Sequence, residues 1–182
     1  KRHGALHVSG TDLKDCHGAK FQLKGVSTHG IAWFPQYVNK DAFQTLRDNY
    51  GINTIRLAMY TNKSEGYGPD AVNKVREGVK YATELGMYVI IDWHILNDGN
   101  PNQHKSEAKK FFTKMSKKYG GQKNVIYEIC NEPNGNVTWN KQIKPYAKTI
   151  VKTIRKHSKN AVIVIGTPTW SQDVDVVAQS PL

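Results

Sequence analysis

The feature that most constrains the fold of this chain is a regular alternation of short apolar runs with amphipathic helical patterns. The apolar runs lie at about 22–28, 53–60, 87–94, 124–131 and 161–166. Helical patterns lie between them at 41–49, 70–85 and 106–119, then from Pro145 to about His157, and a fifth begins near Gln172. Apolar runs of this kind are typical of strands buried on both faces, and the first three helical patterns each stop just before a glycine. The alternation therefore predicts five βα units on one parallel sheet.

The length of the chain limits how far this architecture can close. Residues 5–24 are broken by turn residues and predict a hairpin before the first core strand. Right-handed crossovers curl successive βα units the same way, and eight units close a barrel of about 250 residues. With 182 residues and no break in composition, we expect residues 1–182 to form a single domain of barrel-like or open parallel α/β type, too short to close.

The composition is that of a soluble globular protein, with 38% hydrophobic and 23% charged residues and a net charge of +11. No apolar run approaches the roughly 20 residues that span a bilayer. Lysines gather at 105–123 and 141–159, where we expect solvated outer helix faces. Since no helix-turn-helix, zinc-finger or aromatic-basic pattern accompanies them, we expect neither a nucleic-acid nor a membrane partner. Attraction to acidic polysaccharides or cell surfaces is an alternative that the composition leaves open.

Cysteine and histidine give no sign of a metal or redox site. Cys16 and Cys130 are isolated from one another, and Cys130, inside an apolar run, is expected to be buried and inert. The histidines outside the strand ends have no ligand spacing; these are His3, His7, His17, His104 and His157. We therefore expect no metal and no cofactor.

The tripeptide Asn131-Glu132-Pro133 is the most informative motif. It follows the apolar run that begins at Val125. Proline removes a backbone donor and keeps the residue before it out of helical geometry, so the strand is expected to stop and turn there. In parallel α/β proteins the carboxyl ends of the strands carry the chemistry, which makes Glu132 a candidate functional carboxylate.

Ionisable residues occur in matching phase on three neighbouring strands. Strand alternation groups Arg56, Ala58 and Tyr60, then Asp92 and His94, then Glu128, Cys130 and Glu132. Buried charges cost several kcal/mol each unless they pair, so we predict an ion network below a polar cleft, with Arg56 and Glu128 as the favoured pair. A satisfied internal salt bridge would explain these deeper residues equally well, whereas His94 and Glu132 lie at the functional end of the strands.

Aromatic side chains follow the same strand ends: Trp33, Tyr60, Trp93, Trp139 and Trp170. Indole faces at the mouth of a cleft suit pyranose rings, which present flat C–H faces and a rim of hydroxyls. Trp93 is out of phase with His94, so we expect it to belong to the core.

Five motifs at five successive strand ends resemble glycoside hydrolase family five, on its cellulase (endo-β-1,4-glucanase) branch. They are LKGVSTHG at 23–30, IRLAMY at 55–60, VIIDWH at 89–94, VIYEICNEP at 125–133 and GTPTWSQ at 166–172. The resemblance covers the chain from about residue 6 to its end. It implies a (β/α)8 TIM barrel, here an incomplete barrel of about five βα units with an N-terminal hairpin. It also implies a secreted, extracellular protein that hydrolyses β-glucan polysaccharides or cello-oligosaccharides.

The resemblance also implies roles for individual residues. Glu132 matches the general acid/base and Asn131 its neighbour that bonds the substrate's 2-hydroxyl, while His94 and Arg56 match residues that support the catalytic carboxylates. Positions that line glucose subsites are matched by His29, Trp33, Tyr60 and Trp170. A retaining mechanism needs a second carboxylate about 5 Å away, which the family carries on strand seven, and no glutamate among the 182 residues fits that role.

Three other hypotheses accompany this one. The chain could be a non-catalytic glucan-binding module or truncated fragment that keeps the aromatic cleft without the nucleophile, or a basic protein that binds polyanions. An open parallel sheet also leaves an unpaired strand edge and apolar surface, so self-association that covers them is a further expectation.

Overall fold

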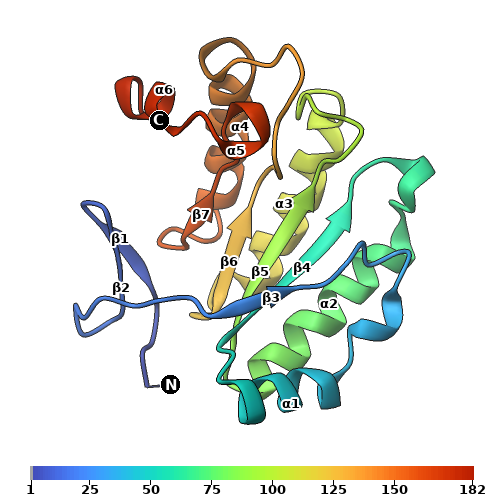
Figure 1. Ribbon diagram of the computed structural model, residues 1–182, viewed down its shortest axis with the longest axis vertical. Helices are drawn as coiled ribbons and strands as arrows, with labels where there is room; N and C mark the ends of the chain where they lie inside the picture. The colour runs from blue at the N-terminus through green and yellow to red at the C-terminus, as the bar shows by residue number, and fades with distance from the viewer. Residues whose placement is uncertain (1) are drawn as a thin grey trace.

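The computed structural model describes residues 2–182 and contains a five-stranded parallel sheet backed by helices (Figure 1). The strands are β3 (Gly25–Ser27), β4 (Thr54–Tyr60), β5 (Tyr88–His94), β6 (Val125–Glu128) and β7 (Ile163–Val164). Their order in the sheet follows the sequence, and every pair is parallel. All five predicted strands are confirmed in position, although the outer ones are shorter than the apolar runs.

Four long helices connect the strands: α1 (Lys40–Tyr50), α2 (Pro69–Glu84), α3 (Lys105–Tyr119) and α4 (Lys144–Arg155). Local signals explain their ends. The Asn39 side chain caps α1 by accepting a hydrogen bond from the Ala42 amide at 2.8 Å. Gly51 ends the same helix with a φ of 66°, a conformation that glycine adopts without strain.

Short helical turns complete the connections: η1 (Pro35–Tyr37), η2 (Lys63–Glu65), the π-helical η3 (Trp139–Ile143), α5 (Pro168–Ser171) and α6 (Val174–Gln179). The helix expected to begin near Gln172 is confirmed as α6, which begins at Val174. The sequence did not predict the turn α5 before it, where Thr169, Trp170 and Ser171 have φ values of 54°, 53° and 64°, so α5 departs from regular helical geometry.

The helices pack on one face of the sheet and form the main core. Leu57, Ile91 and Tyr127 lie side by side in neighbouring strands and are fully buried under helical side chains. Trp93, also fully buried, packs with its ring centroid 5.3 Å from that of Phe111 in α3, which confirms the expectation that it is a core residue. Burying each such side chain contributes about 1.5–3 kcal/mol.

The opposite face of the sheet is apolar at its amino end and polar at its carboxyl end. At the amino end, Tyr88 and Ile126 pack with Leu6, which leads into the hairpin of β1 (His7–Ser9) and β2 (Asp12–Lys14). The Tyr88 hydroxyl donates a 2.7 Å hydrogen bond to the Gly4 carbonyl. The predicted hairpin is thus confirmed, and it covers the lower end of this face.

The two outermost strands keep one edge unpaired. Val26 in β3 and Val164 in β7 are each 38% exposed, unlike their counterparts in the central strands. None of the helices in the described part of the chain is long and apolar enough to cross a membrane.

Candidate active site

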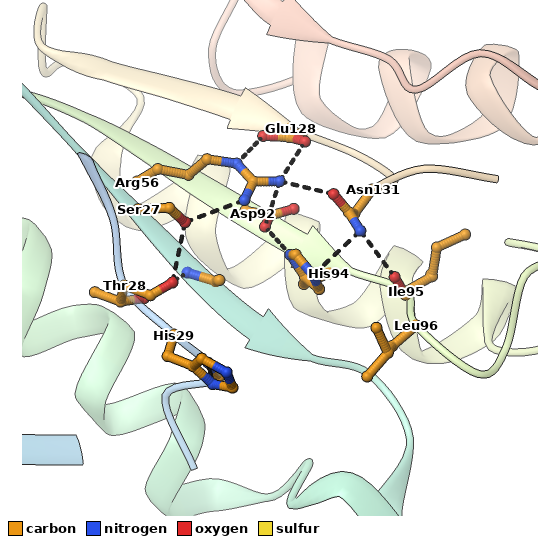
Figure 2. A network of polar contacts seen from close by, with 12 residues as sticks. Ser27, Thr28, His29, Arg56, Asp92, His94, Ile95, Leu96, Glu128 and Asn131 are labelled. Carbon is orange, nitrogen blue, oxygen red and sulfur yellow. Dashed lines mark hydrogen bonds and ion pairs between the residues drawn. The ribbon is translucent and has the colours of Figure 1, made fainter. Parts of the chain in front are cut away.

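Polar side chains from β4, β5 and β6 converge at the carboxyl end of the sheet, on the face away from the helices (Figure 2). The strand register sets Ala58, Asp92 and Glu128 level with one another, and Tyr60 level with His94. This is the phase match that the sequence predicts.

Arg56 is the centre of the network. Its Nε and Nη2 atoms donate 2.7 Å hydrogen bonds to the two carboxylate oxygens of Glu128, which confirms the predicted pair in bidentate form. Nη2 also lies 2.8 Å from Asp92 Oδ2 and 3.0 Å from Asn131 Oδ1, and Nη1 donates to Ser27 Oγ at 3.1 Å. One guanidinium therefore contacts two carboxylates, an amide and a hydroxyl.

Charge and burial oppose each other at this guanidinium. Burial by itself would lower the pKa of Arg56, but the hydrogen bond to Glu128 and the neighbouring negative charges outweigh it, so the pKa is raised. The charges involved belong to Asp92, Glu128 and Glu132. The Glu132 carboxylate therefore acts electrostatically on the network.

Asp92 is the most deeply buried acid of the group, with no exposed surface. Burial raises the pKa of Asp92 to about 6, against the opposing effects of the His94 hydrogen bond and the Arg56 charge. The physical reason is that one guanidinium serves two carboxylates, so the negative charge of Asp92 is only partly compensated. Its Oδ1 atom has no hydrogen-bond partner among the described residues.

The hydrogen bonds define the protonation state of His94. Asn131 Oδ1 accepts from Arg56, so Asn131 Nδ2 is the donor in its bonds to Ile95 O and His94 Nε2, both 3.1 Å long. Nε2 must then accept, and Nδ1 carries the proton donated to Asp92 Oδ2 at 2.6 Å. This pattern assigns a neutral imidazole whose tautomer is set by Asp92 on one side and Asn131 on the other.

The chain leaves regular strand geometry just before Glu132. Asn131 and Glu128 both bind Arg56 although they are three residues apart. The expectation that Glu128, Cys130 and Glu132 lie on one face of a regular strand is therefore wrong. Backbone bonds from Ile129 to Val164 and from Asn131 to the Trp93 carbonyl continue the pairing past β6. Glu132 itself is exposed and has a φ of 33°, so the chain turns at this residue.

Close packing of the neighbouring loop holds this turn. A Cβ atom on Gly166 would lie 2.6 Å from both the Cys130 carbonyl oxygen and Pro133 Cδ. The Trp170 amide donates a 3.0 Å hydrogen bond to the Pro133 carbonyl. The segment after β7 is thus attached to the residues that flank Glu132.

An aromatic group stands beside the network at the end of β3 and β4. The rings of Trp33 and Tyr60 meet edge to face, with centroids 4.9 Å apart, and Tyr60 lies 5.3 Å from His94. His29 stacks on Trp33 at 6.0 Å. Trp33 is 51% exposed, whereas Tyr60 is only 7% exposed, so the indole presents the open surface and the phenol supports it.

The other two tryptophans differ from each other. Trp170 is 54% exposed and lies in the segment bound to Pro133. Trp139 is buried, and its Nε1 donates to the Ser180 carbonyl at 2.7 Å. The expectation that Trp139 lines the mouth of a cleft is therefore wrong, because the π-helical turn rotates it into the core.

Sequence reasoning missed a second layer of polar residues under the aromatic group. Glu65 is 4% exposed, accepts a hydrogen bond from Asn97 Nδ2, and leaves Oε2 without a partner in the described chain. Burial, and then the charge of Glu65, raises the pKa of Tyr60. The signal available in the sequence was Asn62 three residues before this glutamate, a capping pattern that predicts an ordered turn, which the structure shows as η2.

No group of three or more His, Cys, Asp or Glu residues within 2–182 is arranged to hold a metal ion. The side chains available at the site are instead a carboxylate facing solvent, a fixed amide and imidazole, and an exposed indole. Such a set can transfer a proton and bind a hydroxyl-rich ligand through hydrogen bonds and ring stacking.

Comparison with known proteins gives consistent matches. A sequence profile described as "Cellulase (glycosyl hydrolase family 5)" matches residues 14–182. Endoglucanase N of Pectobacterium atrosepticum is 52% identical over 182 residues, which cover 99% of this chain and 41% of that protein. An endoglucanase of Clostridium saccharobutylicum is also 52% identical, with 98% of this chain and 40% of that protein covered.

Solved structures show the same fold. The cellulase Cel5C_n superposes with a TM-score of 0.94 at 41% identity, covering 99% of this chain and 58% of that one. A variant of the Thermobifida fusca endoglucanase Cel5A in complex with cellotetraose gives a TM-score of 0.92 at 36% identity, with 99% and 61% covered. The chain thus spans about two fifths of the curated relatives, and the predicted incomplete barrel of five βα units is confirmed.

Proposed function

Because this chain belongs to glycoside hydrolase family 5, the cellulase family, we propose that it forms part of a single catalytic domain that cleaves β-1,4-glucosidic bonds within glucan chains. The observation that carries the proposal is the solvent-facing Glu132 carboxylate beside the Arg56-centred network. An exposed carboxylate on such a support can act as a proton donor and is open to a polymer.

In the proposed retaining mechanism, Glu132 is protonated when substrate binds and donates its proton to the glycosidic oxygen. The network behind it positions Asn131 and His94 next to the reacting sugar. A second carboxylate about 5 Å away must attack the anomeric carbon. Glu128 is occupied on both oxygens by Arg56, and Asp92 is buried, so the nucleophile would come from outside these 182 residues.

The proposed substrate is a β-glucan or cello-oligosaccharide. Trp33 and Trp170 would stack against sugar faces, while His29 and the supporting Tyr60 would line neighbouring positions. The complex of the Thermobifida fusca endoglucanase with cellotetraose supports this assignment. Such an insoluble polymer is met outside the cell, so we also propose an extracellular location.

A chimera tests the catalytic part of the proposal. The matching segment of Endoglucanase N, 41% of that protein, is replaced by this chain, and reducing-end release from carboxymethylcellulose is measured. Glu132→Gln should lower kcat by about 10²–10⁴-fold, because general acid catalysis is lost. The control Glu107→Gln, in α3, should retain activity. A chimera that remains active with Glu132→Gln would refute the role of this carboxylate.

A second candidate function is glucan binding without hydrolysis. It is favoured by one observation: both other carboxylates near Glu132 are engaged by Arg56. The chain by itself is titrated with cellohexaose and assayed for hydrolysis. Binding that is lost in Trp33→Ala, with no products formed by the unaltered chain, supports this candidate for the 182 residues taken alone.

Self-association is a related proposal, since β3 and β7 each have an unpaired edge. Two copies could cover these edges and the valines exposed on them. Light scattering distinguishes the two states directly: a mass of about 41 kDa, twice the 20.5 kDa of one chain, supports association, and a stable monomer argues against it.

A further inference from the structure

The net positive charge of this protein comes from one segment of the chain. The segment 105–159 contains fourteen lysine and arginine residues against three glutamates, which equals the whole net charge of +11. Two of those glutamates, Glu128 and Glu132, belong to the site on the other side of the sheet. Glu107 is therefore the only acid of this segment that lies with its basic side chains.

The lysines share the outer faces of α3 and α4, which pack against each other behind the sheet (Figure 1). The exposed lysines of this α3–α4 lysine surface are Lys109, Lys110, Lys114, Lys117 and Lys118 on α3, Lys148 and Lys152 on α4, and Lys156 at the C-terminal cap of α4. The last three are four residues apart, which sets them about 6 Å apart along one side of the helix. None of these lysines takes part in an ion pair with a described residue.

Unpaired lysines at neighbouring positions lower the stability of a helix. In the same chain, α2 carries lysines that are paired with glutamates instead. On α2, Lys74 pairs with Glu77 at 2.6 Å and Lys80 lies 3.9 Å from Glu84. Like charges four residues apart destabilise a helix by a few tenths of a kcal/mol per pair. The first turn of α4 also lacks any acidic residue to complement the helix dipole. A protein can be soluble without two adjacent helices whose exposed faces carry almost only positive charges.

We propose that the α3–α4 lysine surface binds an anionic polysaccharide that carries carboxylate groups. Charge complementarity identifies a polyanion. Lysine rather than arginine makes up the exposed set, so it lacks the planar side chain that most often pairs with two acceptors on a base edge. The aromatic rings of the two helices, including Phe112, Tyr119 and Tyr146, are buried, so none is available to stack on a base. Binding of a polymer of uronate sugars requires only regularly spaced positive charges on the protein surface.

The surface lies on the helical side of the sheet, so a bound polymer would leave the Glu132 face open. Binding at the α3–α4 lysine surface does not require hydrolysis at Glu132.

The test measures binding of the full chain to polygalacturonate by affinity electrophoresis at increasing sodium chloride. Binding should weaken steeply with salt, since each lysine contact releases counterions. The triple variant Lys148→Gln, Lys152→Gln and Lys156→Gln should bind at least about tenfold more weakly. Glutamine has nearly the helix propensity of lysine, so α4 should remain folded, which circular dichroism checks.

The matched control removes three lysines elsewhere, as Lys14→Gln, Lys24→Gln and Lys63→Gln, and reaches the same net charge. It should bind polygalacturonate within about twofold of the unaltered chain, because attraction falls off over a Debye length of about 10 Å. An equal loss of polygalacturonate binding in both triple variants, or no binding of the unaltered chain at low salt, would overturn the proposal. Tighter binding to double-stranded DNA than to polygalacturonate would overturn the choice of polymer.

Discussion

Replacement of Asp92 by asparagine isolates the energetic cost of the buried acid. Asp92 is fully buried, and burial raises its pKa from 3.8 to about 6. Asparagine has nearly the same shape and does not titrate. The difference in unfolding free energy between the two proteins therefore reports the ionisation of this one carboxyl group.

The sign and size of the effect follow from the two pKa values. Below about pH 3 the acid is protonated in both the folded and the unfolded chain, and it contributes no pH dependence. Between 3.8 and about 6 the unfolded chain ionises while the folded chain holds the proton, so stability falls as pH rises. Each pH unit corresponds to about 1.4 kcal/mol, which gives a loss of about 3 kcal/mol that is complete above about pH 7.

Urea unfolding of both proteins across this pH range provides the measurement. The stability of the unaltered chain relative to Asp92→Asn should fall by about 3 kcal/mol between pH 3 and pH 7 and stay level above that. A pH-independent difference in unfolding free energy between the two proteins does not affect the test, because the test uses only how that difference changes with pH. A difference that is flat, or that rises with pH, would mean that Arg56 compensates Asp92 fully and would refute the reasoning.

Three further predictions concern single side chains. Arg56→Met should cost about 3–5 kcal/mol, because it leaves Glu128 without a partner and Asp92 with only His94, whereas Lys74→Met, which breaks a partly exposed pair with Glu77, should cost less than about 1 kcal/mol by the same urea assay. Burial raises the pKa of Cys130 to about 12, so a thiol reagent at pH 8 should modify only the exposed Cys16 in the native protein and both thiols in urea; two reactive thiols without urea would contradict the burial. Tyr146→Phe removes a 2.6 Å hydrogen bond to a buried backbone carbonyl and should cost about 1–3 kcal/mol, and an unchanged Tm would show that water replaces the bond.

The fold was largely predictable because the sequence repeats one simple pattern. Apolar strands and amphipathic helices alternate, and glycines such as Gly51 and Gly86 end the helices. The Arg56–Glu128 pair was predictable for a related reason: ionisable residues in apolar strands must find partners, and strand alternation shows which ones face each other. The Glu65 layer was not predictable, since its partner Asn97 comes from another loop. Periodicity carries no information about contacts between loops.

The limits of periodicity also explain the error at β6. Alternation predicts that Asn131 faces away from Glu128, but both side chains bind Arg56. The left-handed φ of Glu132 costs on the order of 1 kcal/mol or more for a residue other than glycine, and the surrounding contacts must supply this energy. They do so through Asn131, fixed by His94 and Arg56 on one side, and through the contact of Gly166 with the Pro133 ring on the other. The buried ion network therefore acts beyond its own charges, because it holds the turn that sets Glu132 at the open face of the sheet.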